Sequence, residues 1–154
     1  MYMKNVAFIF ARKGSKRIKN KNTKLLNGKP LISYTLNFVK NIKYIDEVVV
    51  STDDNKIVNY CKKNGIKNII SRPKSLASDT AKEFHAWKHG VKEFLKKNKK
   101  FNTFISLPLT SPLREKKDFE SAYKLYRNKN LDMVISICKT NHYPDFNIVN
   151  KDNN

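Results

Sequence analysis

The sequence predicts a three-layer α/β/α fold built on a mostly parallel β-sheet. Short apolar runs, typical of buried strands, alternate with longer segments in which apolar residues recur at helical spacing. Alternating strands and helices with short connections favour a parallel sheet covered by helices on both faces. The 154 residues, of which 40% are hydrophobic, have the size and apolar content of one domain. We therefore expect a single domain over residues 1–154.

Five segments are predicted to be strands, because each is a short run of β-branched, aromatic or other apolar residues. In chain order they are residues 6–10, 47–51, 69–70, 104–107 and 133–138. Ligands of parallel α/β sheets bind beyond the carboxyl ends of the strands. The loops that follow the strands are therefore the candidate sites.

Four segments are predicted to be helices. Residues 30–40 begin with a proline that suits a first turn, and residues 55–64 are followed by Gly65, a suitable C-terminal cap. Thr80 opens a capping box with the glutamate three residues later, and residues 117–127 form the last helix. The side chains expected to face inward are Leu31, Ile32, Leu36, Val39, Ile57, Val58, Cys61, Phe84, Trp87, Val91, Phe94, Phe119, Ala122, Tyr123 and Tyr126.

Composition narrows the class of protein. The net charge of +19 is consistent with a polyanionic partner such as nucleic acid or a nucleotide, and equally with a lysine-rich solvated surface. No apolar stretch is long enough for a membrane span, and the N-terminus lacks the pattern of a signal peptide, so we expect a cytoplasmic protein. Cys61 and Cys138 lie far apart in apolar patterns, which indicates buried thiols.

The loop after the first predicted strand is the first candidate site. Residues 11–22 contain six basic side chains around one glycine and one serine. Backbone N–H groups, a hydroxyl and fixed cations are suitable ligands for phosphate oxygens. The glycine spacing matches neither a Walker A sequence nor a dinucleotide fingerprint. A solvated basic loop is the alternative interpretation.

Three further loops carry polar groups after predicted strands. Asp53 follows the second strand and either orients a ligand or caps the next helix. Arg72 follows the third strand, and its planar cation suits a triphosphate. Residues 78–80 lie at a predicted helix start, where capping is the alternative. Residues 107–114 combine two hydroxyls and an arginine with two prolines, and a rigid turn is the alternative there.

Taken together, these segments resemble the acylneuraminate cytidylyltransferase family, the CMP-sialic acid synthetases and their relatives for other nonulosonic acids. The resemblance rests on Ala11–Asn22, Val50–Asp53, Arg72–Thr80 and Thr110–Arg114, with Asn27–Leu31 also in register. It covers nearly the whole chain in the right order. It implies a Rossmann-like nucleotidyltransferase fold and transfer of CMP from CTP to the anomeric hydroxyl of the sugar acid, with release of pyrophosphate.

The resemblance also implies roles for individual residues. Arg12 and Lys21 would be the catalytic residues, holding the CTP phosphates and stabilising charge as the α-phosphate is attacked. The residues implied in nucleotide binding are Arg12, Gly14, Ser15, Lys16, Lys21, Asn22, Arg72, Ser78, Asp79 and Thr80. Those implied in substrate binding are Thr110, Ser111 and Arg114.

The chain departs from the family pattern in three respects. Pro108 stands where the family usually has Gln or another polar residue facing the sugar. Family chains continue well beyond residue 154, into a segment that carries most sugar contacts and much of a homodimer interface. That segment also holds an acidic motif for Mg²⁺, which is therefore expected as cofactor although its usual ligands are not in these residues. We expect a chain that binds CTP and turns over slowly or not at all.

Two other functions remain open from sequence. One is a CMP-Kdo synthetase-like enzyme, which shares the fold and the chemistry; Thr110–Arg114 favours the acylneuraminate branch. The other is a non-catalytic basic domain that binds RNA or another polyanion. The sequence lacks the interleaved aromatic and basic residues of an RNA-recognition sheet, so nucleic acid is the less favoured partner.

Overall fold

The computed structural model describes residues 4–97 and 100–137. The chain divides into two compact units, Met1–Arg114 and Glu115–Asn154, and each is described by itself. The expectation of one domain over residues 1–154 stays a prediction.

The first unit contains a four-stranded sheet in the order β5-β4-β1-β6, and every pair of neighbours is parallel. The strands are β1 (Asn5–Ala11), β4 (Glu47–Thr52), β5 (Asn68–Ser71) and β6 (Thr103–Ser106). Four of the five predicted strands are confirmed, with ends shifted by at most one residue. All four strands end at the same edge of the sheet, because they run in the same direction.

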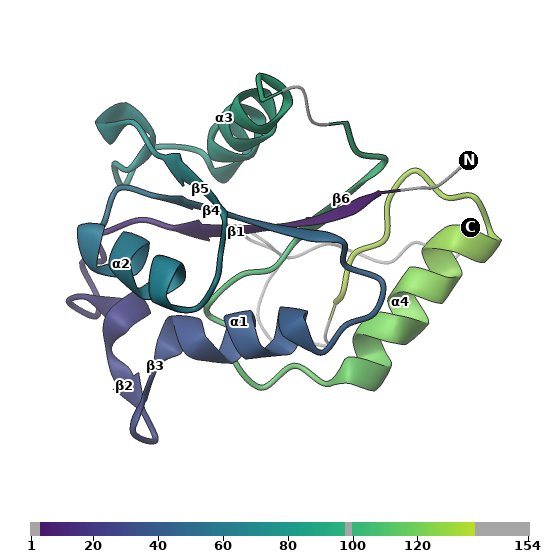
Figure 1. Cartoon of the computed structure of the whole chain (residues 1–154), viewed down its shortest axis with the longest axis horizontal. Coiled ribbons are helices and arrows are strands. Elements are labelled where there is room, and N and C mark those ends of the chain that lie inside the picture. The colour runs from purple at the N-terminus through teal and green to yellow at the C-terminus, as the bar shows by residue number, and fades with distance from the viewer. Residues whose placement is uncertain (1–3, 98–99, 138–154) are drawn as a thin grey trace, which may run out of the picture. The chain divides into compact units, whose positions relative to one another are not determined.

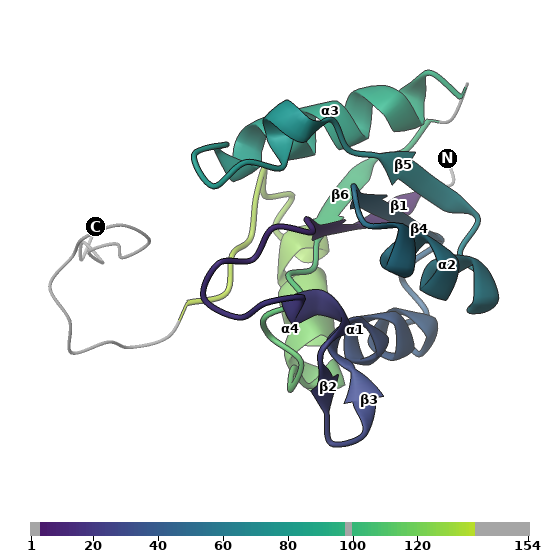
Figure 2. The same ribbon diagram turned by 90° about the vertical axis from the view of Figure 1, so that its left-hand side faces the viewer.

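Helices cover both faces of this sheet, which confirms the predicted three layers. Figures 1 and 2 show α3 (Glu83–Leu95) on one face, with α1 (Leu31–Lys40) and α2 (Asn55–Lys63) on the other. β1 supplies both cores because its side chains alternate. Ala7, Ile9 and Ala11 pack with residues of α1 and α2, whereas Val6 and Phe8 pack with Phe94 of α3.

The ends of α2 are set by two local signals. The Asp54 side chain is the N-cap and accepts a hydrogen bond from the Lys56 backbone N–H at 2.9 Å. At the other end Gly65 has φ +78°, which glycine adopts without strain. The N–H of Ile66 donates to the Cys61 carbonyl at 3.0 Å and that of Gly65 to the Lys62 carbonyl at 3.1 Å, the two bonds of a Schellman motif. The predicted cap at Gly65 is therefore confirmed.

Gly90 allows α3 to approach the sheet closely. It is buried in the middle of the helix, and a Cβ atom built there would lie 3.1 Å from the Phe10 ring and 3.6 Å from the Phe8 ring. Both aromatic residues belong to β1. The missing side chain thus makes room for two rings of the central strand.

Two expectations about α3 are wrong. The helix begins at Glu83 with Lys82 as N-cap and no side-chain capping bond, so Thr80 forms no capping box. Phe84 is 63% exposed, although Phe94 is buried and Trp87 and Val91 are half-buried. Helical spacing gives the orientation of a face correctly, but it does not report how far the core beneath that face extends.

A small hairpin was not predicted. β2 (Leu25–Leu26) and β3 (Lys29–Pro30) pair antiparallel, and Asn27 and Gly28 between them have φ values of 46° and 74°. Two left-handed residues in succession are typical of a type I′ turn, for which Asn-Gly is the preferred sequence. The flanking strands are too short to show an alternating apolar and polar pattern, so the Asn27-Gly28 dipeptide was the available sequence signal for this hairpin.

The second unit contains α4 (Lys116–Asn128). Its predicted inward side chains, Phe119, Ala122, Tyr123 and Tyr126, are all half-buried, and the rings of Phe119 and Tyr123 are stacked. The strand predicted at 133–138 is not formed over residues 133–137, where Met133, Ile135 and Ile137 are 73%, 60% and 67% exposed. An alternating pattern does not by itself provide a neighbouring strand to pair with. Cys138 lies outside the described residues.

Candidate nucleotide-binding site

The loops after the four parallel strands meet at the carboxyl edge of the sheet, where the sequence placed the candidate site. Hydrogen bonds join these loops to one another near their starts. The Thr52 hydroxyl donates to the Ala11 carbonyl at 2.6 Å, and the Arg72 backbone N–H donates to the Thr52 carbonyl at 3.0 Å. The ends of β1, β4 and β5 are thereby held in a fixed relation.

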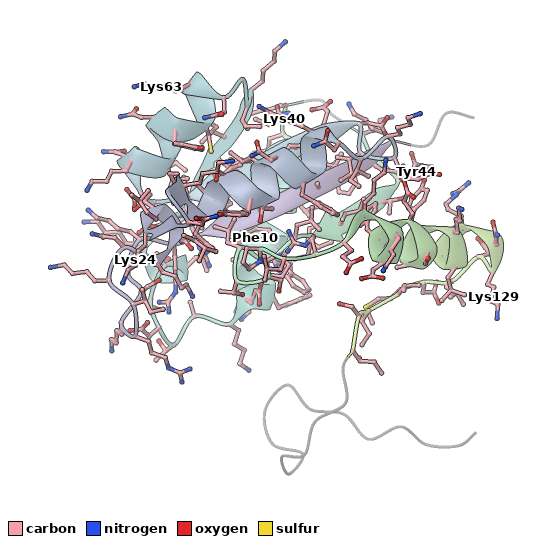
Figure 3. All side chains as sticks on the ribbon, turned by 90° about the horizontal axis from the view of Figure 1, so that it is seen from below. Phe10, Lys24, Lys40, Tyr44, Lys63 and Lys129 are labelled. Carbon is pink, nitrogen blue, oxygen red and sulfur yellow. The ribbon has the colours of Figure 1, made fainter. Side chains whose placement is uncertain are left out.

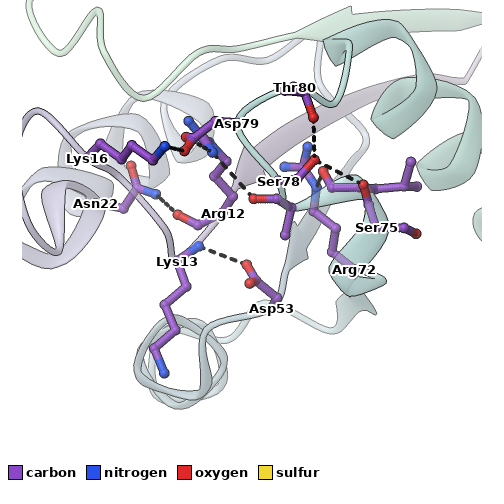
Figure 4. A network of polar contacts seen from close by, with 12 residues as sticks. Arg12, Lys13, Lys16, Asn22, Asp53, Arg72, Ser75, Ser78, Asp79 and Thr80 are labelled. Carbon is purple, nitrogen blue, oxygen red and sulfur yellow. Dashed lines mark hydrogen bonds and ion pairs between the residues drawn. The ribbon is translucent and has the colours of Figure 1, made fainter.

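The basic loop after β1 is held by two side chains (Figure 4). The Asp53 carboxylate accepts a hydrogen bond from the Lys13 backbone N–H at 2.8 Å. The buried Asn22 amide donates to the Arg12 carbonyl at 2.9 Å and so joins the two ends of the loop. Of the two roles expected for Asp53, the helix cap is wrong, because Asp54 caps the helix. Asp53 supports the basic loop, and its role toward a ligand stays a prediction.

A cavity of about 270 Å³ lies among these loops. Its lining contains eight of the residues that the family resemblance implicates: Arg12, Ser15, Lys21, Asn22, Arg72, Ser78, Asp79 and Thr110. The rest of the lining is Phe10, Ala81, Glu83, Ser106, Leu107, Pro108 and Leu109. The last three belong to the candidate loop 107–114, whereas the other four lie within predicted strands and helices, where no chemical signal marked them.

Arg12 and Lys16 share one carboxylate (Figure 4). Arg12 Nη1 lies 2.6 Å from Asp79 Oδ1, and Lys16 Nζ lies 2.9 Å from Asp79 Oδ2. Hydrogen bonds from Lys16 and Arg12 lower the pKa of Asp79 from its ordinary value, so the carboxylate is ionised near neutral pH. The Asp79 carboxylate thus contacts Arg12 and Lys16, two cations that the family resemblance implies in nucleotide binding.

Arg72 is the deepest cation of the cavity. The residue is only 8% exposed, and its Nε donates to the Leu76 carbonyl at 2.8 Å. Burial lowers the pKa of Arg72 from its ordinary value. The negative charges of Asp53 and Glu83 oppose this shift, and the positive charge of Arg12 adds to it. A guanidinium keeps its proton in proteins. Arg72 therefore presents a fixed positive charge to the cavity, and its burial strengthens its attraction for an anion.

Several predicted residues lie outside the lining of this cavity. Gly14 borders a neighbouring concavity, and the Thr80 hydroxyl lies 3.3 Å from that of Ser78. Ser111 is exposed and does not line the cavity.

Arg114 also lies outside the lining and has contacts of its own. Its guanidinium donates to the Thr35 hydroxyl at 3.2 Å and to the Pro108 carbonyl at 2.6 Å, and it lies over the Phe38 ring. Burial lowers the pKa of Arg114. It joins the loop after β6 to α1, so its direct role toward substrate stays a prediction.

Acidic residues at the cavity do not, as they stand, fit a metal site. Asp79 is paired with two cations, and one Glu83 oxygen accepts a hydrogen bond from the Trp87 indole at 3.2 Å. Over residues 4–97 and 100–137 no group of three or more His, Cys, Asp or Glu side chains lies close enough together to hold a metal ion.

The parallel sheet with helices on both faces is the Rossmann-like fold of nucleotidyltransferases. A family model described as cytidylyltransferase matches residues 6–147. The chain belongs to this cytidylyltransferase family.

Curated relatives extend the comparison. The chain is 36% identical over 124 residues to the pseudaminic acid cytidylyltransferase of Campylobacter jejuni, covering 80% of this chain and 53% of that protein. It is 32% identical over 144 residues to the post-translational flagellin modification protein B of Campylobacter coli, covering 92% and 60%. It is 32% identical over 142 residues to the N-acylneuraminate cytidylyltransferase of Escherichia coli, covering 92% and 33%. The chain thus spans between a third and three-fifths of the length of these relatives.

Solved structures give the same fold. CMP:2-keto-3-deoxy-manno-octonic acid synthetase complexed with CTP matches with a TM-score of 0.67 and 25% identity, covering 82% of this chain and 48% of that one. 4-Diphosphocytidyl-2C-methyl-D-erythritol synthase matches with a TM-score of 0.66 at 13% identity, covering 83% and 56%, and supports the fold alone. Among the described helices none has the length and apolar character of a membrane span.

Proposed function

We propose that this chain is the CTP-binding part of a cytidylyltransferase that makes CMP-nonulosonates. The observation that carries the proposal is the convergence of Arg12, Lys21 and Arg72 on one cavity at the carboxyl edge of the sheet. In the proposed reaction the anomeric oxygen of the sugar acid forms a bond to the α-phosphorus of CTP. The bond between the α-phosphorus and the bridging oxygen breaks, its electron pair leaves with pyrophosphate, and the hydroxyl proton is released.

The residues of the chain would contribute charge and position. The basic loop after β1 lines the cavity with Arg12, Ser15, Lys21 and Asn22, and the triphosphate would lie against these residues. Negative charge grows on the bridging oxygen as the bond breaks, and fixed cations lower the barrier because they need no reorganisation. Phosphate oxygens would take over the Arg12 and Lys16 donors that Asp79 now holds.

The names of the relatives support the proposed substrate class. The names of those in Campylobacter jejuni and Escherichia coli specify pseudaminic acid and N-acylneuraminate, both acidic nonulosonic sugars. A CMP-Kdo synthetase-like function is the second candidate. It is supported by the solved structure of CMP:2-keto-3-deoxy-manno-octonic acid synthetase with CTP, which matches this chain with a TM-score of 0.67 and 25% identity. Mg²⁺ as cofactor, a homodimer and a cytoplasmic location are further proposals taken from the family resemblance.

The test is calorimetry of this chain with CTP, UTP, ATP and GTP. We expect CTP to bind at least about tenfold more tightly than the other three, a preference of about 1.4 kcal/mol. A salt series accompanies it, because binding by charge alone weakens steeply with salt and does not distinguish bases. Equal affinities for all four nucleotides would leave the polyanion-binding function as the better explanation.

Pyrophosphate release with CTP and a panel of sugar acids then separates the two enzymatic candidates. The panel contains pseudaminic acid, N-acetylneuraminic acid and Kdo. Release that depends on either of the first two supports the proposal, and release with Kdo alone supports the second candidate.

A further inference from the structure

The chain contains two Asn-Gly dipeptides, Asn27-Gly28 and Asn64-Gly65. In such a pair the backbone nitrogen of the glycine can attack the asparagine side chain, because glycine has no side chain to shield that nitrogen. Both glycines have positive φ, 74° at Gly28 and 78° at Gly65. The dipeptide alone therefore does not distinguish the two positions, whereas their surroundings do.

Asn64-Gly65 is held at the C-terminal end of α2. The Asn64 side-chain amide donates to the Tyr60 carbonyl at 2.8 Å. The Gly65 N–H donates to the Lys62 carbonyl at 3.1 Å, and the next residue, Ile66, is buried in the core. Attack of the Gly65 nitrogen on the Asn64 side chain must break both hydrogen bonds, so the reaction requires the end of α2 to unfold.

Asn27-Gly28 lacks such contacts. Both residues are exposed, and Figures 1 and 2 show the β2–β3 hairpin extending away from the four-stranded sheet. Over residues 4–97 and 100–137 no hydrogen bond engages the Asn27 side chain or the Gly28 N–H. The two reacting groups therefore become available as soon as the turn changes conformation.

Few interactions hold the hairpin in one conformation. Its strands have two residues each, and Leu25 and Leu26 are 65% and 42% exposed. A hairpin this short is marginally stable, and apolar side chains that stay in solvent add little to its stability. The Tyr34 hydroxyl donates to the Leu26 carbonyl at 2.6 Å, but this contact involves neither turn residue. Opening of the turn therefore costs far less than unfolding of the core.

We propose that Asn27 is a site of spontaneous deamidation, with solvent water as the co-reactant, and that the fold protects Asn64. The Gly28 nitrogen gives its proton to solvent, and its electron pair forms a bond to Cγ of Asn27. The bond between Cγ and Nδ2 breaks, and Nδ2 keeps the electron pair, takes up a proton and leaves as ammonia. Water then adds to a carbonyl carbon of the cyclic imide, and one ring C–N bond breaks.

The bond that breaks in the imide decides the product. Cleavage between the nitrogen and Cγ gives aspartate at position 27 with an unchanged main chain. Cleavage between the nitrogen and the main-chain carbonyl carbon gives isoaspartate, in which the chain runs through Cγ. Isoaspartate lengthens the main chain by a methylene group, so the two-residue turn can no longer keep the register of β2 and β3. The reaction needs no nucleotide, so its outcome is independent of the proposed function.

The test follows both dipeptides in one sample of the unchanged chain. The chain is incubated at neutral pH, well below its unfolding temperature, and peptide mass spectrometry measures deamidation at Asn27 and Asn64 separately over time. A protein isoaspartate methyltransferase with labelled S-adenosylmethionine measures isoaspartate. The same incubation in urea gives both rates in the unfolded chain. Asn27→Gly removes the reacting amide and leaves Gly-Gly, which also suits a type I′ turn, whereas Asn64→Gly is the matched control.

We expect deamidation in the folded chain to be at least about tenfold faster at Asn27 than at Asn64, because only the hairpin opens readily. In urea the two rates should agree within about threefold, since both asparagines precede glycine. Asn27→Gly should lose most of the methyl acceptance, and Asn64→Gly should keep it. Equal rates in the folded chain, or faster reaction at Asn64, would overturn the proposal. A large difference that persists in urea would also overturn it, because the difference would then come from local sequence and not from the fold.

Discussion

The guanidinium of Arg12 is held by the Asp79 carboxylate. Asp79 bonds Arg12 and Lys16 together, and its lowered pKa keeps the contact ionic through the neutral range. A triphosphate that enters the cavity must share or replace these contacts. Asp79 therefore orients both cations, and its negative charge opposes that of the ligand. The affinity lost when one cation is removed reports the difference between its contact with phosphate and its contact with Asp79.

Arg12→Ala and Lys21→Ala are each expected to weaken CTP binding by about 1–3 kcal/mol, the range for losing a charge-assisted contact. Both side chains line the cavity. Calorimetry measures the loss, and the circular-dichroism spectrum should be preserved because neither side chain belongs to the core. Lys67→Ala, at an exposed position outside the lining, is the control. Unchanged affinity in both variants would place the nucleotide elsewhere.

Cys61 is expected to make the free energy of unfolding fall as pH rises through the alkaline range. The thiol is fully buried, and burial raises its pKa from 9.0 to about 11. Because the unfolded chain releases this proton at lower pH, the contribution is intact below about pH 9 and is lost as pH rises toward 11. The loss amounts to about 2–3 kcal/mol.

Urea unfolding of the unchanged chain and of Cys61→Ala from pH 8 to 11 measures this contribution. The advantage of the unchanged chain should shrink as pH rises, and lysine titration cancels in the comparison. Parallel stability curves would contradict a raised pKa at Cys61.

At the scale of elements, the contact between α3 and β1 couples the core to the cavity. Gly90 lies against Phe10, and Phe10 lines the proposed CTP cavity. Gly90→Val should destabilise the fold by about 1–3 kcal/mol, the usual range for overpacking a core. It should also weaken CTP binding, because the displaced Phe10 ring would move toward the cavity.

Denaturant unfolding and calorimetry on Gly90→Val measure the two effects together. Lys88→Val, at an exposed position on the same helix, controls for the low helix propensity of valine. A loss of stability without any change in CTP affinity would show that Phe10 does not transmit the change.

Sequence patterns predicted the elements well where their side chains are buried. The strands β1, β4, β5 and β6 and all four helices were predicted, because apolar runs and helical spacing report burial directly. The strand at 133–138 was wrong over its described part, since pairing partners are not encoded locally. The positions of the loops and the family resemblance predicted one site for Arg12, Lys21 and Arg72, whereas Phe10 and Glu83 line the cavity through tertiary structure alone.

For the whole molecule, charge is spread beyond any single site. The chain has 32 Lys and Arg against 13 Asp and Glu. Exposed lysines occur on many elements, and Figure 3 shows side chains such as those of Lys24 and Lys63 on the outside of the ribbon. Most of this charge is a solvated surface, whereas the cavity holds a small part of it.

Turnover is expected to require more than this chain. The chain matches 53% of the length of the Campylobacter jejuni relative, so the other residues of that protein have no aligned counterpart in this chain. We expect CTP to bind to the 154-residue chain, with slow or absent pyrophosphate release on addition of sugar acid and Mg²⁺. A chimera that carries the remaining segment of this relative should release pyrophosphate rapidly. Full activity of the short chain would show that it positions the sugar by itself.

The strand order has a consequence for synthesis of the chain. β1 lies inside the sheet, yet its two neighbours come late in the chain: Val6 pairs with Glu47 of β4, and Asn5 pairs with Thr103 of β6. Such a high contact order slows folding, because long loops must close before the contacts form. Until β6 has left the ribosome, one side of β1 is an unpaired strand edge, a surface prone to aggregation. Nascent chains of this protein are therefore expected to need chaperone protection until the last strand of the sheet is made.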